Sequence, residues 1–337
     1  MSTLVERQQI GKKQDLAEAF VNADQRSLPF TSAVRKGRPP IATQLEYPVE
    51  RFDAPTTTGA VDEADPSNFA DPSAGDALLL ARVQTWEKAA RIGGLAISTT
   101  AQAGTTPRNI VAKKIAKTLI ELKRSIELTV LSDNESASDN GVTGNQTRGL
   151  GKWIQSTAQS NLPVDAAYRT PSTSIETSTA IADYTDNTFT GVFQSMYDQH
   201  GRGDLAFDLW TGSTFKRGLG RITFYSRNET NMTQVRRFNQ DSMDTVQMGK
   251  VDVLETDFGT ANVRLSQFIN VSGDHTSANS KRLAYAVPDE FVEMRFSDQP
   301  NSMELAKTGR NMKYLVTATA ALAVTNPLPL GKFAPTS

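Results

Sequence analysis

The chain has 337 residues, with 36 basic and 37 acidic side chains and no cysteine. A net charge near zero gives no overall field that would draw the chain to nucleic acid or to a membrane. The lack of cysteine excludes disulfides, thiolate catalysis and Cys-based zinc sites. The length fits one large fold with subdomains. No window approaches the ~20 apolar residues that cross a bilayer, and residues 1–7 lack the apolar run of a signal peptide, so we expect a soluble chain that is not exported.

Residues 1–40 are polar and carry more basic than acidic side chains. The spacing of Leu16, Ala19, Phe20 and Ala23 predicts one short helix, and the rest of this region is typical of an extended arm. An ordinary frayed terminus is the alternative.

Two segments with strand signals follow. From Thr43 to Phe52 polar and apolar residues alternate, which places Leu45 and Tyr47 on one face. Pro48 favours a position at a sheet edge. A second extended segment runs from about Leu79 to Arg91, and we expect the two to pair as a long hairpin.

The stretch between these strands, residues 53–76, carries six acidic side chains and no lysine or arginine. Loops beyond about 12–15 residues are uncommon in compact domains unless they are functional or disordered, and an isolated two-stranded hairpin is only marginally stable. One interpretation is that the hairpin rests on another copy of the chain, whose basic side chains balance this acidic segment. A disordered surface loop is the alternative.

A long helix is predicted from Pro107 to Ser132. Thr106 can cap its first turn, and proline fits the first helical position. Apolar residues recur every three or four positions and form one stripe; they are Val111, Ile115, Leu119, Leu122, Ile126 and Val130. The lysines off this stripe are either a solvated face or a contact for an acidic partner.

The carboxyl half mixes helices and strands. Helices are predicted at 189–200 and 213–224. Strands are predicted at 205–210, 250–255, 261–268, 282–287, 291–296 and 314–324, the second and third of them turning at Phe258-Gly259. This order indicates an α+β fold without regular βαβ alternation.

The chain lacks the residue patterns of an enzyme. His200 and His275 stand in unlike contexts, and we expect surface or hinge roles for both. Gly218 to Thr223 begins like a dinucleotide loop but lacks its third glycine. Asp133 to Gly141 fails the ligand spacing of a calcium loop. We therefore expect no catalytic residues, no cofactor and no metal site.

Short motifs in a fixed order extend over nearly the whole chain. They are Leu28-Pro29-Phe30, Lys36-Gly37-Arg38, Leu45-Glu46-Tyr47, Asp53-Ala54-Pro55, Val61 to Asp65, Arg82 to Lys88, Ser98 to Ala103, Glu121 to Glu127, Arg148 to Ile154, Glu255 to Gly259 and Leu305 to Gly309. Each is weak alone, but the ordered set is specific. Through it the chain resembles the major head proteins of tailed phages related to the phage SU10 capsid protein, within the wider HK97-fold coat group.

The resemblance implies an α+β, HK97-like coat fold and a division of the chain. The implied parts are an N-terminal arm at 1–40, an extended E-loop β-hairpin at 41–92, a P-domain at 93–182 with its spine helix at 107–132, an A-domain at 183–271, and strands returning to the P-domain with a C-terminal tail at 272–337.

The resemblance also implies a function in assembly. Copies of the chain would form the hexamers and pentamers of an icosahedral phage head that encloses double-stranded DNA without sequence-specific binding and without a membrane. Scaffolding and portal proteins, and possibly a cement or decoration protein, would be partners. The chain would assemble in the host cytoplasm and end in the virion.

Contacts between subunits are expected at the acidic segment, the strand that follows it and the basic arm. The residues are Asp62, Glu63, Asp65, Arg82, Trp86, Lys88, Arg35, Lys36 and Arg38. Three other functions stay open at this point: the shell of an encapsulin-type bacterial nanocompartment, a minor head or decoration protein, and a soluble enzyme. Enzyme cargo would distinguish the first, and failure to assemble alone would distinguish the second.

Overall fold

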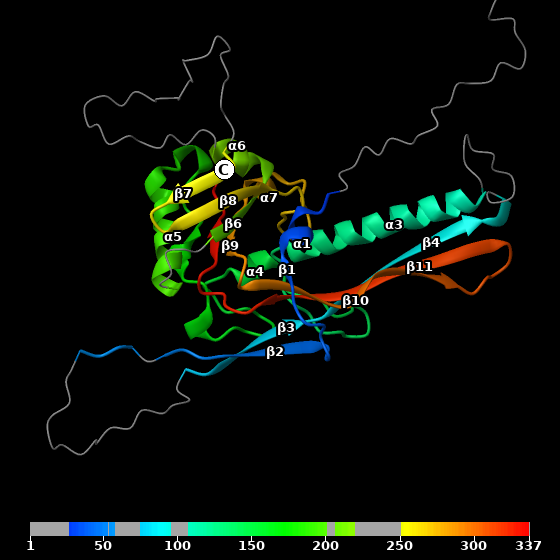
Figure 1. The fold of residues 1–337 in the computed structure, drawn as a ribbon, viewed down its shortest axis with the longest axis horizontal. Coiled ribbons are helices and arrows are strands. Elements are labelled where there is room, and N and C mark those ends of the chain that lie inside the picture. The colour runs from blue at the N-terminus through cyan, green and yellow to red at the C-terminus, as the bar shows by residue number, and fades with distance from the viewer. Residues whose placement is uncertain are drawn as a thin grey trace, which may run out of the picture.

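The computed structural model describes residues 27–52, 54–57, 75–95, 107–200, 206–219 and 251–336. Within them the chain forms a four-stranded, a six-stranded and a two-stranded sheet. Figure 1 shows the long helix α3 (Pro107–Val130) lying along the first sheet and projecting away from the six-stranded one. No helix in this part of the chain is long and apolar enough to cross a membrane.

The four-stranded sheet has the order β1-β10-β11-β4. Its members are β1 (Arg35–Lys36), β10 (Val292–Leu305), β11 (Asn311–Val324) and β4 (Gln84–Gly93). The strands β10 and β11 form a long antiparallel hairpin, and β4 pairs antiparallel with β11. Leu122, Ile126 and Val130 of α3 are buried against this sheet, as expected for an apolar helix stripe.

The six-stranded sheet has the order β5-β12-β9-β6-β8-β7. Its strands are β5 (Ile175–Glu176), β12 (Gly331–Phe333), β9 (Ala284–Pro288), β6 (Ala206–Thr211), β8 (Gly259–Leu265) and β7 (Val253–Thr256). The helices α5 (Asp186–His200), α6 (Ser213–Leu219) and α7 (Ala278–Arg282) accompany it. Aromatic side chains from α5, α6 and the sheet, among them Phe189, Phe215 and Phe333, form one buried cluster.

The two-stranded sheet is the hairpin of β2 (Gln44–Val49) and β3 (Ala77–Arg82). Leu45, Tyr47, Leu79 and Ala81 point inward and join the main core. The remaining elements are short: α1 (Pro29–Ala33), α4 (Leu150–Trp153) and the 3-10 turns η2 (Ala166–Tyr168), η3 (Ser172–Ser174) and η4 (Ile181–Asp183).

Several predicted elements are confirmed. The long helix is α3, the helix predicted at 189–200 is α5, and the strands that turn at Phe258-Gly259 are β7 and β8. The helix predicted at 213–224 is present as α6 over the residues that the structure describes there. The short helix predicted near Leu16 and Phe20 lies outside the described residues.

The long hairpin predicted from residues 43–52 and 79–91 is wrong in its second half. The segment divides at Val83: β3 pairs with β2, whereas β4 pairs with β11. Pro39 and Pro40, shortly before β2, have no backbone N–H, so this part of the chain offers few hydrogen bonds to β4. Trp86 and Ile92 of β4 are buried beside β11 instead.

The sheets also do not follow a division of the chain at residue 271. The strands β9 and β12, which come after it, lie in the six-stranded sheet beside β6. The strands β10 and β11, between them in sequence, instead form the sheet beneath α3.

Candidate functional site

The β2–β3 hairpin is the first candidate, because its end carries exposed apolar side chains. Phe52, just beyond β2, is 91% exposed, and Leu78 at the start of β3 is also exposed. A shallow groove of about 420 Å³ lies at this end, lined by Pro48, Val49, Glu50, Asp76, Ala77 and Leu78. Exposed apolar surface next to a groove is typical of a protein contact.

Both ends of the hairpin are held by their own chain. The Arg51 guanidinium donates to the Ala167 carbonyl at 3.1 Å, and the Tyr168 hydroxyl donates to the Gly75 carbonyl. Arg82 donates to the Asn145 side-chain oxygen at 3.3 Å. Residues 145–168 therefore form a support that holds the hairpin at both of its ends.

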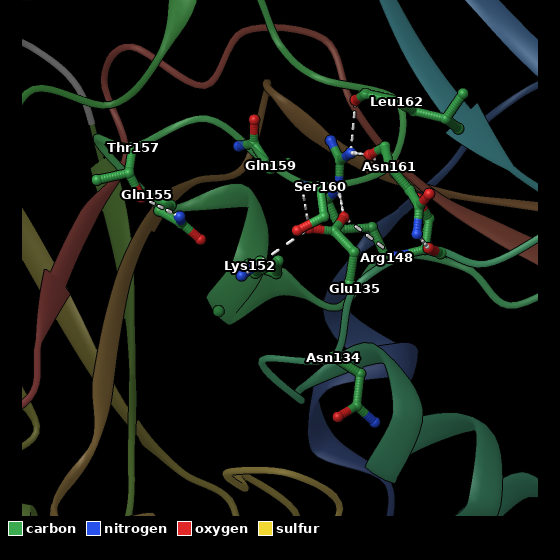
Figure 2. Close-up of polar contacts among 12 residues, drawn as sticks. Asn134, Glu135, Arg148, Lys152, Gln155, Thr157, Gln159, Ser160, Asn161 and Leu162 are labelled. Carbon is green, nitrogen blue, oxygen red and sulfur yellow. Dashed lines mark hydrogen bonds and ion pairs between the residues drawn. The ribbon is translucent and has the colours of Figure 1, made fainter.

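This support is organised around Arg148, which is 1% exposed (Figure 2). Its Nε donates to Glu135 Oε1 at 3.0 Å, and its Nη2 donates to the carbonyls of Asn161 and Leu162 at 2.5 and 2.6 Å. Burial lowers the pKa of Arg148, and the Glu135 carboxylate opposes that shift. The guanidinium also stacks on Trp153, 4.6 Å from the ring centre.

Glu135 connects further parts of the support. Its Oε2 accepts from the Ser160 amide at 3.2 Å and lies 3.8 Å from Lys152 Nζ. Leu162 adopts a positive φ of 49°, a conformation that costs energy for a residue other than glycine. The buried Arg148 bonds hold the loop in this shape.

The predicted contact residues of the arm lie at the surface. Arg35, Lys36 and Arg38 are all exposed. Arg35 reaches Glu293 Oε2 at 3.5 Å, so it also has a partner within its own chain. Arg35 and Lys36 make up β1 and Arg38 follows it; we call these three exposed cations the arm patch.

The predicted contact residues of β3 and β4 have contacts within the chain. Trp86 is only 7% exposed, and its indole donates to the Thr129 hydroxyl of α3 at 3.2 Å. Lys88 Nζ lies 3.3 Å from Glu121 Oε2 of α3, and Arg82 binds Asn145 as described above. Asp62, Glu63 and Asp65 lie outside the described residues.

The two histidines do not come together. His200, at the end of α5, lies 3.8 Å from the Glu290 carboxylate, and its ring packs on Phe291. His275 packs against Phe268. Among the described residues no three His, Asp or Glu side chains are grouped to hold a metal ion.

Sequence reasoning missed Arg148 and Glu135. The motif from Arg148 to Ile154 carries the family resemblance. It does not predict a buried arginine, because an arginine whose acceptors are loop carbonyls has no partner residue at a fixed spacing in the sequence. It also missed Glu127, an acidic residue within the apolar run from Ile126 to Leu131. That interruption was the available signal for a buried carboxylate.

Comparison with known proteins identifies the family. The family model described as SU10 major capsid protein matches residues 3–337. The chain belongs to this family. It is a major capsid protein of tailed phages, a structural component of the phage head. No curated protein matches the sequence.

Solved structures with the same fold are phage and phage-like capsids. One, titled as the cyanophage A-1(L) capsid asymmetric unit, is 12% identical with a TM-score of 0.64 and covers 97% of this chain and 98% of its own. The capsid of an empty GTA particle is 10% identical with a TM-score of 0.59, over 97% and 96%. A Mycobacterium phage Bobi structure is 11% identical with a TM-score of 0.57, over 97% and 96%. The HK97-like α+β fold expected for this capsid protein is confirmed.

Proposed function

We propose that copies of this capsid protein assemble into hexamers and pentamers that close into an icosahedral head around double-stranded DNA. The observation that carries the proposal is the β2–β3 hairpin. Its two ends are held by its own chain, while Phe52, Leu78 and the adjoining groove face solvent. A two-stranded sheet gains most of its stability from what it packs against, so a neighbouring subunit completes the burial of this end.

The charges favour a contact between copies. Residues 53–76 carry acidic side chains and no basic ones, while Arg35, Lys36 and Arg38 form the exposed arm patch. In a closed symmetric assembly every subunit presents both surfaces, so one complementary pair is repeated around each ring. The acidic segment of one subunit then lies against the arm patch of its neighbour.

Further partners follow from the same function. Scaffolding and portal proteins direct assembly in the host cytoplasm, and a cement protein can add to the mature shell. The near-zero net charge of the chain suits a container, because strong positive charge would hold the packaged DNA through its phosphates.

A charge exchange tests the contact. The double variant Lys36→Glu/Arg38→Glu should reduce the yield of shells or capsomer rings seen by electron microscopy, and adding Asp62→Lys/Glu63→Lys should restore it, because the two surfaces again carry opposite charge. Arg35 is left unchanged because it also binds Glu293 within the chain. Lys281→Glu, an exposed change on α7, is the control and should assemble normally.

Two results would count against the proposal. If the parent chain gave only monomers, alone and with its neighbouring reading frames, the shell function itself would be refuted. If Lys36→Glu/Arg38→Glu assembled like the control, the pairing of the arm patch with the acidic segment would be refuted. Enzyme cargo in place of DNA inside the particles would indicate a nanocompartment.

A further inference from the structure

Residues Leu28 to Gly37, here called the strap, touch three parts of the subunit that are far apart in sequence. The strap comprises α1, β1 and the residues around them. It contacts α3, the six-stranded sheet and β10. Figure 1 shows α1 and β1 crossing between these elements.

The first anchor is Glu127, a side chain of α3 with 0% exposure. Its Oε1 and Oε2 accept from the backbone amides of Phe30 and Thr31, each at 2.8 Å. The residue before α1 is Leu28, whose side chain makes no capping bond, so the carboxylate of a distant helix satisfies the free amides of the first turn. Charge-assisted bonds of this kind are among the stronger ones in proteins.

The second contact reaches the six-stranded sheet. The Phe30 ring packs edge-to-face on Trp210 of β6, with ring centres 5.1 Å apart. Both side chains are fully buried. The first turn of the strap is therefore fixed between α3 and β6.

The third anchor is Glu293 of β10, which is 4% exposed. β1 pairs in parallel with β10, and the Gly37 amide donates to the Met294 carbonyl at 3.0 Å. Gly37 lies so close to Glu293 that an added Cβ would be 2.5 Å from its Oε2. The same carboxylate is bound by Arg295 at 2.5 Å, as well as by Arg35 from the strap.

Arg295 carries this contact on to the hairpin. Its guanidinium stacks over the Tyr47 ring of β2, 4.6 Å from the ring centre. Tyr47 is buried, and its hydroxyl has no hydrogen-bond partner among the described residues, so stacking and packing hold it in place. A continuous set of contacts runs from Gly37 through Glu293 and Arg295 to the hairpin.

We propose that the strap controls the β2–β3 hairpin: while Glu127 and Glu293 hold the strap, Arg295 is fixed over Tyr47 and the hairpin is rigid; when the strap lifts, the hairpin is released. The strap thereby regulates the surface with which neighbouring subunits join. This inference rests on the proposed function of the hairpin, but its physical content is a coupling within one chain. Such a coupling requires one element that can adopt two positions and that contacts both the anchors and the hairpin.

Hydrogen–deuterium exchange of the purified full chain tests the coupling. Gly37→Ala forces the Glu293 carboxylate away from its position, and Glu127→Gln replaces one of the two oxygens that accept from the first turn with an NH2 group, which cannot accept. Both variants should speed exchange in the strap and also in β2 and β3, on the order of tenfold or more. The matched control is Ser32→Ala, an exposed change on α1, which should alter neither.

The fold control is exchange in α5 and β7, which should match the parent. If Gly37→Ala also exchanges faster in these control elements, its fold is disturbed, and the test is made with Glu127→Gln alone. Faster exchange in the strap with an unchanged hairpin would overturn the proposal. Because the measurement is made within one chain, its result holds even if the parent forms no shell. If every variant formed shells and the hairpin exchanged at the parent's rate, the control by the strap would be refuted and the shell function would remain.

Discussion

Replacing Arg148 with methionine should destabilise the subunit strongly while its surface stays unchanged. Methionine keeps much of the apolar stem but removes the charge that meets Glu135 and the donors to the Asn161 and Leu162 carbonyls. Those partly buried acceptors are then left without their donor.

The size of the effect follows from the burial of the pair. Removing one partner from a buried, hydrogen-bonded ion pair costs about 3–5 kcal/mol. Glu135 is partly exposed, with 19% of its side chain accessible, and keeps Lys152 at 3.8 Å, which places the expected loss near the lower end, at about 3 kcal/mol. This is a large share of the ~5–15 kcal/mol that stabilises a typical domain.

Denaturant unfolding followed by tryptophan fluorescence is the assay, because Trp153 lies directly against the guanidinium. Lys152→Met is the matched control: it removes the other cation of Glu135 from a more exposed position, so its loss should stay below about 1 kcal/mol. If Arg148→Met lost no more than this control, the support of the hairpin would not depend on the buried pair, and the reasoning would be refuted.

Two further changes probe neighbouring features. Gly149→Ala should destabilise the chain by about 1–3 kcal/mol, because its Cβ would lie 2.2 Å from the Ser132 carbonyl oxygen, whereas Gly144→Ala has open space and should be neutral; equal melting temperatures for the two would contradict this. Burial raises the pKa of the Glu127 carboxyl, and the hydrogen bonds from Thr31 and Phe30 partly oppose this shift. The folded chain therefore binds this proton more tightly than the unfolded chain, so the contribution of Glu127 is greatest below the unfolded pKa and declines as the pH rises through the folded pKa. Relative to Glu127→Gln, the parent should lose stability as the pH rises above about 4.3, the ordinary pKa of a glutamate. A stability difference in denaturant titrations that does not change as the pH rises would show that the pKa of this carboxyl is not raised.

The sequence predicts the elements that are marked by a regular spacing of apolar residues or by a clear turn. The apolar stripe ending in Leu122, Ile126 and Val130 locates α3, and the Phe258-Gly259 turn locates the β7–β8 hairpin. The strand pairing is harder, because alternation along residues 79–91 shows that the segment is extended but not which strand lies beside it. Only the position of β11, more than two hundred residues later, decides that β4 leaves β2.

The candidate site was predicted in part. The arm patch and the acidic segment are predicted from charge alone. Arg35, Lys36 and Arg38 are exposed, and their contact with a neighbouring subunit stays a prediction. Trp86 is different, because the sequence pattern of an aromatic residue on a strand is the same whether its side chain faces a neighbouring subunit or α3. The sequence around Glu127 can indicate a buried carboxylate, but it cannot identify the Phe30 amide as its partner, since the two are 97 positions apart.

The place of β12 bears on when a subunit becomes able to join others. This strand lies between β5 and β9, and Phe333 within it is fully buried among the aromatic rings of α5 and α6. During synthesis the six-stranded sheet cannot close until residue 333 has left the ribosome. We therefore expect a subunit to stay unfinished at this sheet until β12 has been made, which delays the association of partly made subunits.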